Sequence, residues 1–218
     1  LQGGKSLAGI AHKEISSKLM SLVVPEVNNN SENLSIDLIK RIRVAIDNLE
    51  KKDWEDAEKG LYPKSQLFEA PWIEWAKRYP KIWLDMPLTW KRRKDRNTRD
   101  IPEIIDKNKY PDYYLQNFHH QTDGYLSDHS AGLYDLQVEI LFNGTADAMR
   151  RRVIAPLKKG LMKFANRDES SLRILDIATG TGRTIKQIRS AFPETELLGL
   201  DLSDAYLQGI YYIQKLDD

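Results

Sequence analysis

Apolar residues follow two different periodicities along the chain, and the change between them falls near residue 170. Upstream, apolar side chains recur every three or four residues, which predicts amphipathic helices. The clearest of these positions are Ile36, Ile39, Ile42, Ile46 and Leu49. Downstream, two short runs rich in branched residues, 172–177 and 196–201, enclose a helical segment, as in parallel strands joined by a helix. We therefore expect a mainly α-helical region over residues 1–165 and an α/β unit over residues 171–218.

Helix-breaking residues set further boundaries in the first region. Residues 1–12 are small and contain glycines, so we expect a loose terminus there, and the polar residues 24–33 predict a loop. In residues 66–90, prolines at positions 71, 80 and 87 predict only short helices or turns, because proline interrupts helical hydrogen bonding. The tryptophans of that segment are expected to pack into an apolar layer. They are Trp72, Trp75, Trp83 and Trp90.

Capping residues predict three successive helices before the α/β unit. Ser127 is expected to cap a helix that ends near Gly144, and Thr145 to cap the next one. Pro156 fits the first turn of a third helix, where its missing N–H is tolerated. The apolar face of the first of these helices is formed by Leu133, Leu136, Ile140 and Leu141.

Basic residues cluster at two places. Residues 91–100 hold six basic side chains in their first nine positions, and Arg150, Arg151 and Arg152 share one helical turn. Such clusters can bind phosphate or steer an acidic substrate. The formal net charge is only +1, which favours solvated surfaces at both places, with residues 91–100 partly mobile.

The composition of the chain argues against cysteine-dependent sites, a membrane-spanning segment and a secretory signal. The 218 residues include no cysteine, which excludes disulfides, thiolate zinc sites and cysteine nucleophiles. No apolar run approaches the roughly 20 residues needed to span a bilayer, and the first residues lack the apolar core of a secretory signal. We expect a soluble cytoplasmic protein, or a plastid one if the chain comes from a photosynthetic eukaryote. Because the chain begins with Leu1, we also expect that its first residues are missing.

The most informative segment is LRILDIATGTGRT, residues 172–184, where the first expected strand runs into a turn of small residues. Small residues there let a ligand approach the backbone N–H groups at the start of the following helix. The second expected strand ends at Asp201, whose carboxylate can accept hydrogen bonds from two ribose hydroxyls. Together these features predict an adenosine-containing ligand.

Two common phosphate-binding motifs do not fit this turn. In the dinucleotide motif G-x-G-x-x-G, the third glycine counted from Gly180 would fall on Ile185. Counted from Ala178, the first glycine is missing and the last position is Arg183. A P-loop needs Gly-Lys-Ser/Thr after a glycine and four spacer residues, and this turn has no such sequence. The residues therefore favour a ligand with ribose and adenine but no pyrophosphate.

These segments resemble the class I S-adenosylmethionine-dependent methyltransferases. The motif LDIATGTG matches the first motif of that family with Ala178 in place of its first glycine, and GLDLS matches the second motif with Asp201. The upstream segment 110–152 is similar to the region before the first motif in a bacterial and plastid-type group with an N-terminal helical extension. The resemblance implies a Rossmann-like methyltransferase fold and methyl transfer to a small-molecule acceptor.

The same resemblance implies roles for individual residues. Asp176 would lie near the amine of the methionine part of S-adenosylmethionine. Ala178, Gly180 and Gly182 would let the backbone approach the cofactor, and Asp201 would bind the ribose. A full sheet of this family has seven strands, whereas two are recognised here. We therefore expect a fragment or an internal omission, and a chain that is not active by itself.

Candidate catalytic residues come from an aromatic and histidine-rich stretch. His119, His120 and His129 lie within eleven residues, and His119, His120 and Tyr125 are candidates for a base that removes a proton from the acceptor. By the resemblance, Gln121 and Tyr125 are also candidates for the cofactor side. A metal site is disfavoured, because no carboxylate stands at a recognised ligand spacing from the histidines. The packing of a helical cap onto the sheet is an equally good explanation for each of these residues.

Two other functions remain open. A binding or assembly protein could keep a methyltransferase-like turn without the activity. A nucleic-acid methyltransferase could use residues 91–99 as its basic patch, although the near-neutral charge disfavours it. The sequence leaves open the acceptor, the atom methylated and the oligomeric state.

Overall fold

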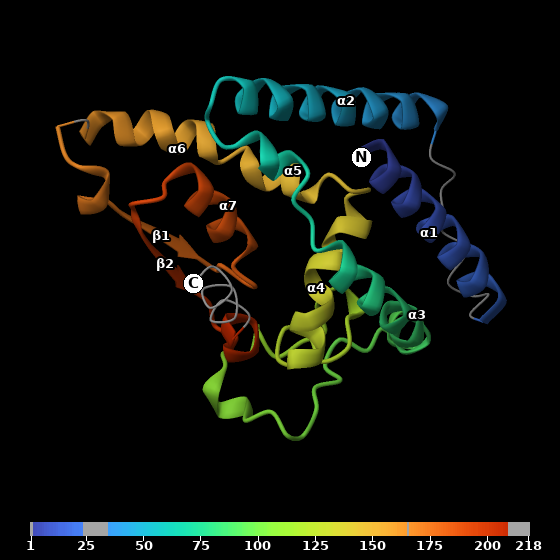
Figure 1. The fold of residues 1–218 in the computed structure, drawn as a ribbon. Coiled ribbons are helices and arrows are strands. Elements are labelled where there is room, and N and C mark those ends of the chain that lie inside the picture. The colour runs from blue at the N-terminus through green and yellow to red at the C-terminus, as the bar shows by residue number, and fades with distance from the viewer. Residues whose placement is uncertain (1, 24–34, 165, 209–218) are drawn as a thin grey trace.

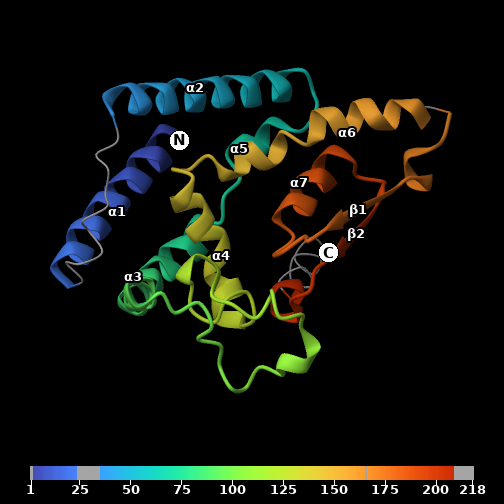
Figure 2. The ribbon, with the colours of Figure 1, turned by 180° about the vertical axis from the view of Figure 1, so that it is seen from behind.

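The computed structural model describes residues 2–23, 35–164 and 166–208. It is mainly helical, with a two-stranded parallel sheet near the end of the described chain. The helices are α1 (Gln2–Val23), α2 (Ile36–Glu58), α3 (Trp72–Asp95), α4 (Asp128–Leu141), α5 (Ala146–Arg151), α6 (Ile154–Leu161) and α7 (Arg183–Ala191). The strands are β1 (Arg173–Ile177) and β2 (Glu196–Leu200). Both views show α1, α3 and α4 grouped on one side, and α7 with the sheet on the other (Figure 1, Figure 2).

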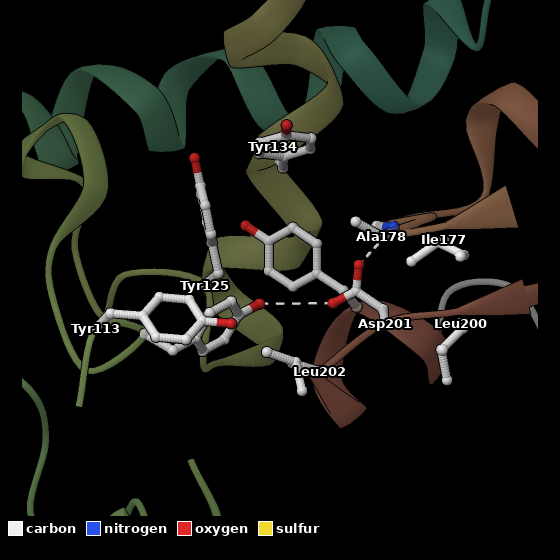
Figure 3. A pocket seen from close by; sticks show the side chains of 11 residues that line it. Tyr113, Tyr125, Tyr134, Ile177, Ala178, Leu200, Asp201 and Leu202 are labelled. Carbon is white, nitrogen blue, oxygen red and sulfur yellow. Dashed lines mark hydrogen bonds between the residues drawn. The ribbon is translucent and has the colours of Figure 1, made fainter. Parts of the chain in front are cut away.

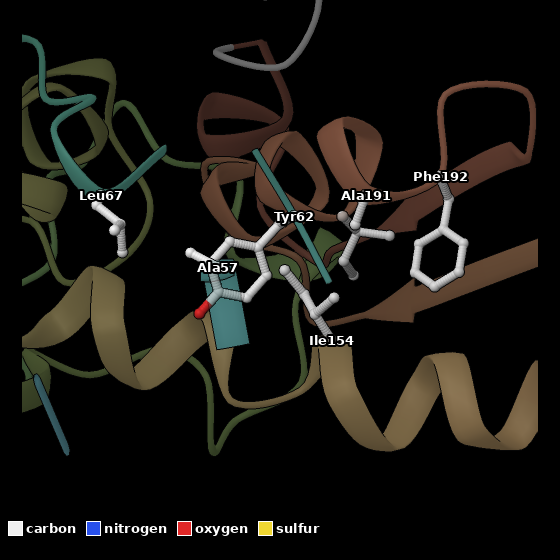
Figure 4. Close-up of a cluster of buried hydrophobic side chains, with 7 residues drawn as sticks. Ala57, Tyr62, Leu67, Ile154, Ala191 and Phe192 are labelled. Atoms are coloured by element: carbon white, nitrogen blue, oxygen red, sulfur yellow. The ribbon is translucent and has the colours of Figure 1, made fainter. Parts of the chain in front are cut away.

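Helices α2, α5 and α6 connect these two groups. Helix α2 packs against α5, and α5 packs against α7. A buried cluster joins α2, the segment after it, α6 and α7 (Figure 4). Its members are Ala57, Tyr62, Leu67, Ile154, Ile188, Ala191 and Phe192. The helical region is therefore fixed to the α/β unit by a shared apolar core.

The strand–helix–strand unit predicted from the sequence is confirmed. Strands β1 and β2 pair in parallel, with Arg173 opposite Glu196 and Ile177 opposite Leu200. Helix α7 covers one face of this sheet. On the opposite face the apolar side chains are exposed, namely Leu175, Ile177, Leu198 and Leu200. The carboxyl ends of both strands therefore open at one edge, next to the turn that precedes α7.

The helix cap predicted at Ser127 is confirmed, because its hydroxyl accepts a hydrogen bond from the Ser130 N–H at the start of α4. The Ser35 hydroxyl also caps a helix, accepting from the Leu38 N–H at the start of α2, which the sequence analysis did not predict. Thr145 does not cap α5, because its hydroxyl instead donates to the Phe142 carbonyl. Pro156 lies in the first turn of α6, as expected. The loop predicted for residues 24–33 lies outside the described residues.

Two predictions about the first region were wrong. Residues 2–12 are not loose but form the first half of α1, which packs against α3 and α4. Residues 72–95 form one continuous helix, α3, that contains Pro80 and Pro87. Each proline leaves the carbonyl one turn earlier without its helical partner. Both prolines are exposed, so water can hydrogen-bond that side of the helix in place of the missing N–H.

The tryptophans and the first basic cluster were only partly predicted. Trp75 and Trp90 are buried, but Trp72 is 44% exposed. Residues 91–95 are helical, as the last turn of α3, rather than a mobile segment. Within them, the Arg92 side chain is buried, and it donates hydrogen bonds to the His120 carbonyl and to Asp100.

No helix in the described part of the chain is both long and apolar enough to cross a membrane.

The arginine cluster of α5 is not a solvated face. Arg151 is 1% exposed, and its guanidinium donates two hydrogen bonds to Asp53 of α2, at 2.9 and 2.6 Å. Arg152 pairs with Asp56 of the same helix, and Arg150 pairs with Asp135 of α4. The three arginines therefore join α5 to its neighbours, because consecutive residues of a helix point in different directions.

A second buried ion pair connects α5 to α7. The carboxylate of Asp147 accepts two hydrogen bonds from Arg183, at 2.7 and 2.6 Å. Burial by itself would raise the pKa of Asp147, but the hydrogen bonds and charge of Arg183 outweigh it and hold that pKa at about 2. Arg183 directly follows Gly182 of the predicted cofactor turn, so this ion pair helps fix the turn.

Acid is expected to weaken this contact. Because the pKa of Asp147 is about 2 in the folded chain and 3.8 as a free group, its stabilisation is present above about pH 4 and is lost as the pH falls toward 2. The loss is about 2 kcal/mol for this one group. Urea unfolding measures the free energy of unfolding at each pH. Between pH 4 and pH 2, this free energy should fall less steeply with decreasing pH for Asp147→Asn than for the wild type. Equal slopes for the two proteins would contradict the prediction.

Candidate functional site

The turn between β1 and α7 has the left-handed backbone that its small residues suggest. Ala178, Gly180 and Gly182 have φ angles of 61°, 58° and 76°. The Thr179 N–H donates to the Leu200 carbonyl at 3.0 Å, which ties the turn to β2. The Thr181 hydroxyl donates to Asp135 of α4 at 2.9 Å. The turn is thus held from both the sheet and the helical region. Alanine at position 178 is an uncommon choice, because a left-handed conformation favours glycine.

Asp201 lies directly beside this turn. One oxygen of its carboxylate accepts the Gly180 N–H at 2.8 Å (Figure 3), and the other accepts the Ser203 N–H at 2.9 Å. The Tyr114 hydroxyl lies 3.5 Å from the second oxygen (Figure 3). A carboxylate can accept about four hydrogen bonds, so Asp201 is oriented by the backbone and can still accept from ligand hydroxyls.

A cavity of about 630 Å³ opens between the turn and a group of tyrosines (Figure 3). On the sheet side it is lined by Ile177, Ala178, Gly180, Leu200, Asp201 and Leu202. On the other side it is lined by Tyr113, Tyr114, Tyr125, Tyr134 and Tyr206. Its size is within the usual range for small-molecule sites. The pocket therefore combines one carboxylate, a backbone of small residues and several aromatic rings.

The tyrosines of this cavity pack against one another. Tyr125 stacks on Phe118 with ring centroids 4.6 Å apart, and Tyr134 meets Tyr206 edge-on at 5.3 Å. Burial raises the pKa of Tyr125 to about 12, and burial followed by the charge of Asp201 raises the pKa of Tyr114. Both phenols are therefore neutral near pH 7. Their rings can attract a cation through their electron-rich faces.

The structure brings together three of the five residues implied to bind a cofactor. Ala178, Gly180 and Asp201 line the cavity. Asp176 is not among the lining residues, and its carboxylate accepts the Thr179 hydroxyl at 2.9 Å, inside the turn. Gly182 directly precedes α7 as its N-cap residue and is not among the lining residues either. Both of them shape the turn.

Sequence reasoning missed two parts of the site. A Cβ atom at Gly199 would lie 2.9 Å from both the Thr179 methyl group and the Ile185 side chain, so any larger residue there would have to push these two side chains aside. Tyr206 is 3% exposed, and its hydroxyl lies 3.0 Å from Ser130 of α4. Gly199 interrupts a strand of otherwise branched residues, and this was the sequence signal for the close approach of β2 to the turn.

The candidate catalytic and cofactor-side residues are divided between two places. Tyr125 lines the cavity described above and also a second cavity next to it, whereas His119 and Gln121 line only the second. Gln121 donates to the Ser130 hydroxyl at 2.7 Å. His120 lines neither cavity; its Nδ1 is buried without a hydrogen-bond partner in the described chain, and burial lowers its pKa. No group of three or more His, Asp or Glu side chains in the described residues is arranged to hold a metal ion.

Comparisons with models of protein families, with curated proteins and with solved structures found no match to this chain. Any functional conclusion therefore rests on the residues and the geometry of the site.

Proposed function

We propose that this chain binds S-adenosylmethionine in the cavity beside Asp201, and that it belongs to a Rossmann-like methyltransferase unit that acts on a small-molecule acceptor. One observation carries the proposal: the carboxylate at the end of β2 and the small-residue turn after β1 line the same cavity. Sequence spacing predicted that pairing for an adenosine-containing ligand. Strands β1 and β2 with α7 would be the first part of the Rossmann-like unit.

The residues of the cavity fit this cofactor in three respects. Asp201 is held by two backbone N–H groups, and two ribose hydroxyls would fill its other acceptor positions by displacing the Tyr114 hydroxyl, whose contact is long at 3.5 Å. Ala178 and Gly180 have little or no side chain between the backbone and the cavity. The tyrosine rings provide an aromatic surface that suits a sulfonium cation. When bound, the cofactor supplies a methyl group on a good leaving group.

The protein's share of the chemistry would be alignment and proton removal. Methyl transfer requires the reacting atoms in line at about 3–3.5 Å, which a rigid cavity can provide. An oxygen or nitrogen acceptor must also lose a proton to a base. A neutral phenol is a poor base, so the raised pKa of Tyr125 favours a histidine for that role and a positioning role for Tyr125. His119 is then the better candidate, because it lines a cavity next to Tyr125.

The proposal is tested by calorimetric titration of S-adenosylmethionine and its demethylated product into the 218-residue chain. We expect micromolar binding by the wild type and at least tenfold weaker binding by Asp201→Asn, because one charged acceptor of the ribose hydroxyls is lost. The matched control is Asp204→Asn, an exposed carboxylate three residues away that does not line the cavity. Ala178→Gly should also bind normally, since it keeps the left-handed turn.

Two results would overturn the proposal. The first is the absence of binding by a folded wild-type chain, shown to be folded by circular dichroism in the same buffer. The second is equal affinity of the wild type and Asp201→Asn. The first result would favour a binding or assembly role, for which the exposed apolar face of the sheet, including Leu175 and Leu198, is the supporting observation.

A further inference from the structure

The first half of α2 carries an apolar face that is largely exposed in the described structure. Its apolar side chains are spaced alternately three and four residues apart, which places them in one line along the helix. The line begins with Ile39 and Ile42, which are 52% and 39% exposed. It continues with Ile46 and Leu49, which are half-buried. An amphipathic helix normally buries such a line against a neighbouring element.

The same face of the helix is buried where it continues toward the end of α2. Asp53, four residues after Leu49, pairs with Arg151 of α5, and Asp56 pairs with Arg152. Both views show the first half of α2 extending beyond α5, away from the sheet (Figure 1, Figure 2). Helix α5 therefore covers only the last turns of this face, and the apolar part lies beyond it.

Two opposite charges flank the apolar line on one side. Arg43 and Glu50 lie seven residues apart, and each directly follows a residue of the apolar line, so both lie on the same flank. Neither forms an ion pair with a described side chain of the same molecule. The opposite flank carries Leu38 and Ala45 at the corresponding positions. One flank of the apolar line is therefore charged with both signs, and the other is apolar over the same turns.

These charges favour a second α2 helix that runs in the antiparallel direction. Two antiparallel helices bring the same flank of each together with the direction reversed, so Arg43 of each copy approaches Glu50 of the other. Helical side chains lean toward the N-terminus of their own helix, which brings the two groups closer. In a parallel pair, Arg43 and Glu50 would instead meet Leu38 and Ala45 of the opposite flank. Only the antiparallel direction therefore forms two ion pairs in each dimer.

From these features we infer that two copies of this chain associate through the first half of α2, packed antiparallel. In this arrangement Ile39 of one copy packs against Leu49 of the other, and Ile42 packs against Ile46. Each contact occurs twice, because a twofold axis relates the two copies. The association is independent of the proposed function, since α2 does not line the cavity proposed for the cofactor.

The apolar contact is tested by sedimentation equilibrium of the 218-residue chain over a range of concentrations. We expect the wild type to reach twice the 25.2 kDa mass of one chain. Ile42→Glu should raise the dissociation constant of the dimer at least tenfold, because it places a charge in the apolar contact. The matched control is Ile73→Glu, at a 73% exposed position of α3, which should associate as the wild type does. Circular dichroism in the same buffer shows whether each variant is folded.

The direction of the helices is tested by charge reversal. Arg43→Glu and Glu50→Arg each place like charges opposite one another in the antiparallel pair. Each should raise the dissociation constant about tenfold, since two ion pairs are changed in every dimer. The double variant Arg43→Glu, Glu50→Arg restores opposite charges and should return to within about twofold of the wild type. In a parallel pair these residues do not meet, so the single reversals would lack this effect.

Three results would overturn this proposal. The first is a wild-type chain that stays monomeric at every concentration measured. The second is a dimer that Ile42→Glu leaves intact, and loss of that dimer in Leu198→Glu would then place the interface on the exposed face of the sheet. The third is a single charge reversal without effect, or a double variant without recovery, either of which would overturn the antiparallel arrangement.

Discussion

Replacement of Arg151 by methionine is expected to lower the free energy of unfolding by about 3–5 kcal/mol. The Arg151 and Asp53 side chains are each 2% exposed and form two hydrogen bonds, so the substitution would leave a buried carboxylate without its cation. The Tyr62 hydroxyl donates to Asp53 at 2.7 Å but carries no charge to compensate it. Urea unfolding followed by circular dichroism would measure the loss.

Arg152→Met is the matched control for this experiment. The Arg152 side chain is 31% exposed, and its partner Asp56 keeps a second cation, Lys52. Replacement of Arg152 should lower the free energy of unfolding by about 1 kcal/mol, as for a partly exposed ion pair. The double variant Asp53→Leu, Arg151→Met should recover much of the stability, because both charges are removed together. Equal effects of Arg151→Met and Arg152→Met would contradict the account of Arg151 as a buried connector.

Gly124→Ala is expected to lower the free energy of unfolding by about 2–4 kcal/mol, from strain and overpacking together. Gly124 has φ +59°, and a Cβ atom there would lie 2.4 Å from the backbone carbonyl oxygen of Gln116. That contact is with the backbone, so no side-chain rotation can relieve it. The segment must shift, and with it Tyr125, which lines the cavity beside Asp201. Binding of S-adenosylmethionine should therefore weaken as well.

The control for Gly124→Ala is Gly132→Ala in α4. Gly132 has a helical backbone. Apart from its chain neighbours and the backbone of its own helix, no atom would lie within 4 Å of a Cβ atom at this position. Alanine should stabilise that helix by about 0.5–1 kcal/mol. The two glycine substitutions are thus predicted to have opposite signs in the same unfolding experiment. A stabilising or neutral Gly124→Ala would show that the loop before α4 tolerates a side chain.

The α/β unit could be predicted from the sequence because its signals are local. The branched run before Ala178 forms β1, and the proline at position 193 follows the end of α7. Strands β1 and β2 begin within one residue of their expected positions. The approach of Asp201 to the turn also follows from local information, since the carboxyl ends of adjacent parallel strands meet at one edge of a sheet.

The errors concern features that depend on distant residues. Arg151 is buried because Asp53, 98 residues earlier, lies opposite it, and no local pattern reports that partner. The first residues are helical although they contain small residues, and α1 packs against α3 and α4. The second cavity is equally non-local, because it joins residues near position 12 with residues near position 140.

The prolines of α3 also give this helix a direction of curvature. Pro80 and Pro87 are seven residues apart, which is close to two turns of an α-helix, so their rings lie on the same side. A proline ring presses on the carbonyl one turn earlier and bends the helix away from itself. We therefore expect the two bends to add, with the concave side toward the buried Trp75 and Ile82, which pack with Leu133 and Leu136 of α4. The spacing of two surface residues would in this way curve α3 around α4.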